Sequence, residues 1–131
     1  MNTNTTETSP TETSPDDARG LFAFAIRPDH AMRDAETIAK FFVPDSPADS
    51  SSAEWMRYAQ SLMSCLIFRC WQRGLPGSQL LRLVQQADVQ ELQQALDGLP
   101  GAARLAGDER MLATVRGIVS THAAGPLSLL C

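Results

Sequence analysis

The longest helical pattern in the chain lies at residues 53–73, AEWMRYAQSLMSCLIFRCWQR. Its apolar residues recur at about 100° per residue, the period of a helix packed into a core. Ser52 is placed to cap the N-terminus of this helix, and Gly74 follows at C′, where a left-handed residue ends many helices. We predict a central core helix whose buried face carries Trp55, Tyr58, Ala59, Leu62, Met63, Leu66 and Cys70.

A shorter amphipathic pattern precedes this helix, at residues 31–43. Asp29 is placed to cap its N-terminus, and Pro44 should stop it because proline cannot continue a helix. The polar run that follows, at residues 44–52, is predicted to be a loop. The buried face of this first helix should hold Ala35, Ile38, Ala39 and Phe42.

Three further amphipathic helices are predicted after Gly74. Ser78 should cap the first and Asp88 the second, which Gly98 closes, and the last covers residues 108–123 until Gly125-Pro126 breaks it. Five helices with short loops predict an all-α fold, a compact orthogonal bundle. The predicted inward positions are Leu80, Leu81, Val84 and Ala87, then Val89, Leu92 and Leu96, then Met111, Leu112, Val115, Ile118, Val119 and, packed or capping, His122.

The N-terminal part of the chain has a different composition. The pentapeptide TETSP occurs twice in residues 6–15, within a Thr-, Ser- and acid-rich stretch that offers no large apolar side chain. We therefore expect residues 1–19 to be a disordered acidic low-complexity tail. Residues 20–28 include LFAFAI, an apolar connecting segment that is either one strand or an extended arm, and no later pattern offers it a partner strand. Residues 29–131 form the predicted all-α domain.

Charge and hydropathy restrict the compartment and the partners. The chain has 15 acidic and 11 basic residues, and residues 1–20 alone contribute a net −3 of the total −4. The remaining near-neutral part lacks the basic excess of a typical duplex-binding domain. Arg69 ends the most hydrophobic run, residues 58–68, before it reaches the length of a membrane span. With no secretory signal pattern either, we expect a cytoplasmic protein whose three thiols are reduced.

The chemistry-bearing residues do not form a recognisable catalytic, cofactor or metal motif. The only lysine is Lys40, and the glycines of residues 74–78 belong to a helix-to-helix turn, so no phosphate-binding loop is predicted. Cys65 and Cys70 point about 140° apart on one helix, which prevents a mutual disulfide or a shared zinc ion. We expect no enzymatic activity and no cofactor.

One group of side chains lies outside this pattern. Phe68 and Trp71 project away from the predicted core face, with Arg69 and Arg73 interleaved. Another helix of the bundle could cover them, or they could form a patch for a partner, since aromatic and Arg side chains anchor many interfaces. The candidate partner-binding residues are therefore Phe68, Arg69, Trp71 and Arg73.

The order of these segments resembles the all-alpha domain of type IV secretion coupling proteins, the TraD/TrwB-like conjugation ATPases. The resemblance covers roughly residues 25–130 and rests on helix patterning and a few anchor residues. It is carried by Ala25-Ile26-Arg27-Pro28 with residues 35–45 (AETIAKFFVPD), residues 54–62 (EWMRYAQSL), and the later runs LLRLV (80–84), ELQQAL (91–96) and MLATVRGIV (111–119).

The resemblance implies a module inserted in a RecA-like motor domain at the cytoplasmic face of the bacterial inner membrane. There it would receive relaxase, relaxosome accessory proteins with their DNA, or secreted effectors, and pass them to the secretion channel. The nucleotide-binding motifs and membrane helices of the family have no counterpart here, so ATPase activity and membrane anchoring are not carried over. We expect a substrate-recognition adaptor, and a monomer in isolation because hexamer formation in the family involves the motor domain. The alternative is a small helical nucleic-acid-binding domain, and a small enzyme is a third reading that lacks a site.

Overall fold

The computed structural model describes residues 25–45, 52–99 and 102–130, and these ranges contain helices and no strand. The predicted all-α fold is therefore confirmed. The predicted tail, most of the connecting segment and much of the loop before residue 52 lie outside the described residues. The elements are η2 (Pro28–His30), α2 (Ala31–Phe42), α3 (Ala53–Gln72), α4 (Gly77–Gln86), α5 (Val89–Leu96), α6 (Ala103–Ala106) and α7 (Glu109–Leu130).

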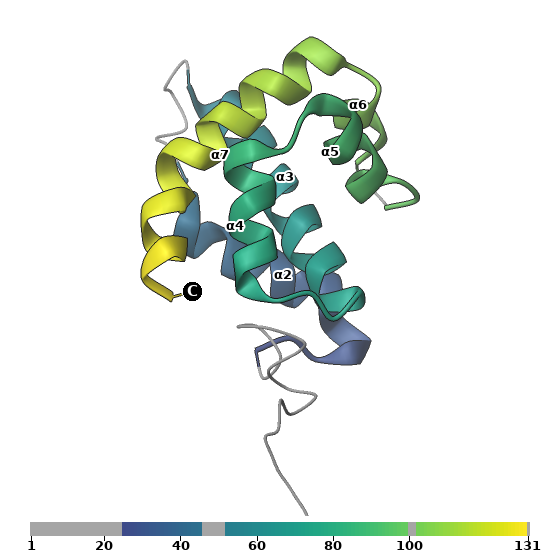
Figure 1. Cartoon of the computed structure of the whole chain (residues 1–131), viewed down its shortest axis with the longest axis vertical. Helices are drawn as coiled ribbons and strands as arrows, with labels where there is room; N and C mark the ends of the chain where they lie inside the picture. Colours follow the sequence, from purple (N-terminus) through teal and green to yellow (C-terminus); the bar gives the residue numbers. More distant parts are fainter. Residues whose placement is uncertain (1–24, 46–51, 100–101, 131) are drawn as a thin grey trace, which may run out of the picture.

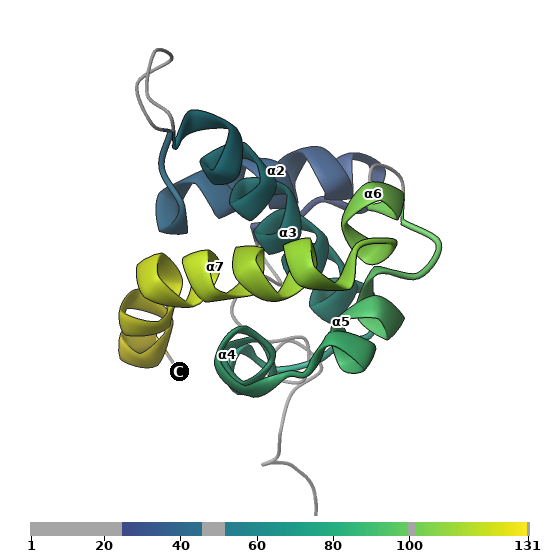
Figure 2. The same ribbon diagram turned by 90° about the horizontal axis from the view of Figure 1, so that it is seen from above.

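Helix α3 is the centre of the bundle. It packs against α2, α4, α5 and α7, and α2 has the most extensive contact with it. Figure 2 shows α7 crossing the molecule, with α2 on one side and α4 and α5 on the other. The short helix α6, which has too few residues to show a hydrophobic period, was not predicted; it packs against α5 and α7 (Figure 1).

The core face of α3 follows the prediction except at its N-terminal end. Trp55 is 40% exposed and Tyr58 is partly buried, so the placement of Trp55 in the core is wrong. In the first turns Ala53 and Met56 are buried instead, so the neighbouring helices cover a face of this end that is rotated from the predicted one. The predicted positions that are buried are Ala59, Leu62, Met63, Leu66 and Cys70.

Glycine ends α3 as predicted. Gly74 has φ 66°, a left-handed conformation that residues with a Cβ seldom adopt. The N–H of Gly74 donates to Trp71 O at 3.1 Å, and the N–H of Leu75 donates to Cys70 O at 2.8 Å. These two bonds are the pair that defines a Schellman motif, and they satisfy carbonyls that the helix end would leave unpaired.

Of the four residues predicted to cap a helix, Ser52 and Asp88 occupy the N-cap position, and only Asp88 makes a capping hydrogen bond. Asp88 accepts a hydrogen bond from Glu91 N at 2.8 Å and caps α5. Asp29 instead lies inside η2, and Ser78 lies inside α4, which begins one residue earlier after Pro76; neither caps a helix. Ser52 occupies the N-cap position of α3, but its side chain makes no capping bond because its backbone is already helical there.

Helix α7 does not end before Gly125-Pro126, where the sequence predicted its end. It continues through Pro126 to Leu130, and Ala123 and Leu127 are fully buried. Pro126 is exposed, so its missing N–H removes one bond on the solvent side, while burial of Leu127 holds the last turns against the body. His122 is exposed, which contradicts its predicted inward position.

Most other inward positions are buried, whereas Ile38, Leu81, Val89, Met111 and Ile118 are only partly so and pack against the rim of the core. Ile26 is 3% exposed, so the end of the connecting segment packs on the body. None of the helices in the described ranges is long and apolar enough to span a membrane.

Candidate functional site

The aromatic pair predicted from the sequence lies at the edge of the core. Phe68 and Trp71 have ring centroids 6.0 Å apart with planes tilted by 43°, and both side chains are partly buried against core residues. Both side chains are therefore neither fully covered by the bundle nor fully exposed. Their role in partner binding stays a prediction.

The two arginines of that group lie in different environments. The guanidinium of Arg69 donates to Ala95 O at 2.8 Å and also to Asp97 O, so it ties α3 to the C-terminal end of α5. This contact satisfies carbonyls that α5 leaves unpaired. Arg73 is exposed, and its side chain has no hydrogen bond or ion pair in the part of the chain that the structure describes.

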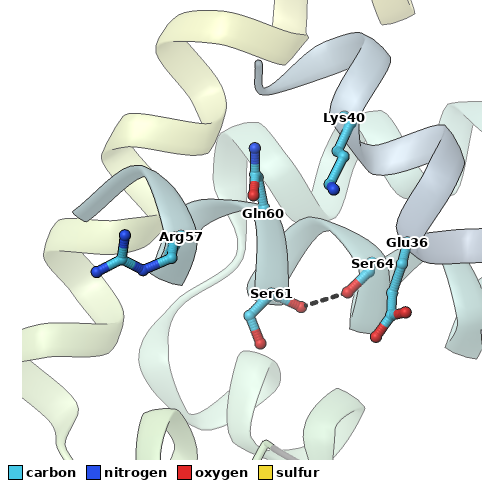
Figure 3. Close-up of a pocket in the computed structure, with 6 residues that line it drawn as sticks. All are labelled: Glu36, Lys40, Arg57, Gln60, Ser61 and Ser64. Carbon is cyan, nitrogen blue, oxygen red and sulfur yellow. Dashed lines mark hydrogen bonds between the residues drawn. The ribbon is translucent and has the colours of Figure 1, made fainter. Parts of the chain in front are cut away.

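A polar hollow of about 300 Å³ lies between α2 and α3, and the sequence analysis did not predict it. Figure 3 shows Lys40 directed over the space between the two helices and Arg57 at its edge, pointing outward. The signal in the sequence was a polar stripe on an otherwise apolar helix, with Arg57, Ser61 and Ser64 at spacings of four and three residues. The hollow is lined by Glu36, Lys40, Arg57, Gln60, Ser61 and Ser64.

Hydrogen bonds within the body hold part of this lining in place. The amide nitrogen of Gln60 donates to Val43 O at 2.9 Å and to Asp45 Oδ1 at 2.8 Å, which fixes the end of α2 against α3. The hydroxyl of Ser64 donates to Ser61 O at 2.9 Å, so its oxygen can still accept. The cationic groups are not fixed in this way, and they can turn toward a ligand.

The charged side chains around the hollow are distributed unevenly. Arg33 lies about two turns before Lys40 on the same side of α2, and across the hollow lies Arg57. None of the three makes an ion pair with a described residue. We call Arg33, Lys40 and Arg57 the basic face. Glu36 is the acid that lines the hollow, and Phe41, beside Lys40, is 82% exposed.

Several other cations of the body already have partners. Arg27 binds Asp34 through two side-chain hydrogen bonds of 3.0 Å, and this lowers the pKa of Asp34 to about 2. Arg82 pairs with Glu91, and Arg116 donates to carbonyls at the end of α4. The basic face is therefore a part of the α2–α3 surface where positive charge is not neutralised within the body, and Arg73 at the end of α3 is a further unpaired cation.

A second exposed cluster joins α3 to α6. The Trp55 and Tyr58 rings meet edge-on at 6.0 Å, and the guanidinium of Arg104 lies 5.8 Å from the Tyr58 ring centroid. The Tyr58 hydroxyl lies 3.4 Å from Glu54 Oε2. The cation–π contact with Tyr58 accounts for the position of Arg104. Trp55 remains partly exposed beside it.

The two thiols in the described part of the chain are poorly suited to reactive chemistry. Cys65 and Cys70 are free and buried, and burial raises the pKa of each to about 11. A thiol with so high a pKa is a poor nucleophile and metal ligand. In the described ranges, no three His, Cys, Asp or Glu side chains lie close enough to hold a metal ion.

The fold and the polar hollow define a small all-α module with a charged surface on α2 and α3, the pair of helices with the most extensive contact. Residues 14–129 match the family described as the type IV secretion-system coupling protein DNA-binding domain, and the chain belongs to this family. The resemblance seen in the sequence is thereby confirmed, and the match begins inside the predicted tail. Searches of curated proteins and of solved structures found no significant match.

Proposed function

We propose that this chain is the substrate-recognition and adaptor module of a type IV secretion coupling protein, which docks a relaxase, a relaxosome accessory protein or a secreted effector. The observation that carries the proposal is the basic face. In a body close to neutral, the unpaired cations Lys40 and Arg57 line a hollow that has room for a side chain of a partner. Arg33 lies about two turns before Lys40 on the same side of α2. Such a surface gives orientation and selectivity to a reversible protein contact.

The sequence-predicted aromatic residues extend this surface along α3. Arg57, Ser61, Ser64, Phe68 and Trp71 recur at spacings of four and three residues, so they follow one side of the helix. A partner segment lying along this line would meet charge at the Arg57 end and aromatic rings at the other. The rings would supply buried apolar area, and the cations would set direction.

We extend this proposal to the setting that the family resemblance implies. The module would act beside a motor domain at the cytoplasmic face of the bacterial inner membrane and would have no enzymatic activity of its own. In isolation it would be a monomer. Its task would be to hold cargo while the motor domain supplies the energy of transfer.

The test is a binding experiment with single charge reversals. We would immobilise the full chain, wash bound relaxosome proteins and effectors at low and then high salt, and identify them by mass spectrometry. Lys40→Glu and Arg57→Glu should each release the cargo at lower salt than the unmodified chain. Arg110→Glu, which reverses an exposed cation on α7, is the matched control. Equal retention by all four chains would overturn the role of the basic face.

DNA binding is the second candidate, favoured by the description of the family. The same three cations could contact phosphates, and an exposed Phe41 could stack on a base. Fluorescence anisotropy with single- and double-stranded oligonucleotides across a salt series would decide. DNA binding requires a steep loss of affinity with salt, and removing one phosphate-contacting cation should reduce the logarithmic slope by about one. A slope unchanged in Lys40→Glu would exclude this face.

A further inference from the structure

The N-terminal segment and the basic face have opposite charge. Within residues 7–17 the chain carries Glu7, Glu12, Asp16 and Asp17 and no basic residue. The segment also has no large apolar side chain, so electrostatic attraction is the force that could hold it on the body. We propose that residues 7–17, which lie outside the described residues, dock on the basic face of the same molecule.

The connection between the two parts makes the contact accessible. Ile26 is buried, and the backbone N–H of Arg27 donates to Asp34 Oδ2 at 2.9 Å, so the chain is fixed to the first turn of α2 where it joins the body. From Ala31 to Lys40 the helix rises about 13 Å. The residues between Asp17 and Ala25 can span about 26 Å when extended, so the acidic positions reach the whole basic face.

The charges on the body favour this surface over others that the structure describes. On the described part of α2 and its entry, Arg27 neutralises Asp34, which leaves Glu36 as the carboxylate that borders the hollow. At the other end of the molecule, the exposed Arg110 stands beside Asp108 and Glu109, so the start of α7 keeps a net negative charge that disfavours the segment. An acidic occupant attached next to α2 is therefore guided to Arg33, Lys40 and Arg57.

Attachment in the same chain compensates for weak exposed ion pairs. Each such pair contributes little and is screened by salt, but a tethered segment is present at an effective concentration in the millimolar range. An acidic or phosphate-bearing partner would have to displace it. This competition rests on the proposed function of the basic face, whereas the docking itself does not.

The docking can be measured without any partner, by paramagnetic relaxation enhancement. In the full chain with Cys131→Ser, a nitroxide would be attached at Ser14→Cys; Cys65 and Cys70 are buried and should not be labelled. At low salt we expect loss of amide signal intensity at Arg33, Thr37 and Lys40. Amides at the start of α7, at the opposite end of the molecule from α2 in Figure 1, should keep their intensity.

Charge reversal gives the control. The triple variant Arg33→Glu, Lys40→Glu, Arg57→Glu should abolish the loss of signal, and replacing the four tail acids by Lys in that variant should restore it. Circular dichroism would verify that each variant is folded. Unchanged intensities on α2 in the original chain, or a loss that persists in the triple variant or at high salt, would overturn the proposal. A failure to bind cargo or DNA would leave this result unaffected, so the two proposals are tested separately.

Discussion

Two residues of α3 show that the loss of stability caused by a substitution depends on whether neighbouring helices cover the side chain. Leu62 is fully buried, whereas Trp55, on an earlier turn, is 40% exposed. Leu62→Ala should destabilise the fold by about 2–5 kcal/mol because it leaves a cavity. Trp55→Ala removes the larger side chain but should have a clearly smaller effect. Urea unfolding of both variants measures this, and equal destabilisation would mean that Trp55 is part of the core.

A single ion pair should give the protein a measurable pH dependence. Arg27 lowers the pKa of Asp34 from 3.8 to about 2, so the folded state favours the carboxylate form. Its contribution to stability is fully present above the unfolded pKa of about 3.8, and it is lost as the pH falls from about 4 to 2.

The variant Asp34→Asn removes this titration. The melting temperatures of the original chain and the variant should differ at pH 5, and the difference should shrink as the pH falls to 2. A difference that stays constant over this range would show that Asp34 contributes through something other than its charge.

At the scale of elements, helix caps show that a capping residue type in the sequence does not by itself produce the capping geometry. Asp88 and Ser78 were both predicted to cap a helix, but only Asp88 does so. Asp88→Ala should therefore destabilise the protein by about 1 kcal/mol, while Ser78→Ala, an exposed change inside α4, should have almost no effect. Thermal or urea unfolding compares them directly. A comparable loss in both variants would contradict the assignment.

The helices that could be predicted are those long enough for their apolar residues to repeat with the helical period. For α2, α3 and α5, most of the predicted helix ends lie within one residue of the observed ends. The reason is that a buried apolar stripe is a property of the local sequence. The prediction missed α6, whose four residues show no period, and it ended α7 too early because proline chemistry is local while burial of Leu127 is tertiary.

The candidate site was less predictable for the same reason. Phe68 and Trp71 stand out on one helix, but the hollow exists only because α2 packs beside α3. Whether a cation is unpaired also depends on distant residues: Arg69 binds carbonyls of α5, while Lys40 has no ion pair in the described ranges. Neither fact is encoded in the local sequence.

At the scale of the whole molecule, the two buried thiols should report on global unfolding. Cys65 and Cys70 lie on α3, which contacts α2, α4, α5 and α7, so exposing either thiol requires the bundle to open. In the Cys131→Ser variant, both should react slowly with a thiol reagent at pH 8. Their rates should rise together with urea, in step with the free energy of unfolding measured by circular dichroism.

The alternative outcome has a specific structural meaning. Cys70 lies in the last turn of α3, where its carbonyl accepts from Leu75, while Cys65 lies a turn further inside. If the end of α3 frayed locally, Cys70 would react first, at a rate nearly independent of urea, and Cys65 would not follow. Mass spectrometry of partly labelled protein distinguishes the two cases. Joint labelling would show that the Schellman end of α3 opens only with the bundle as a whole.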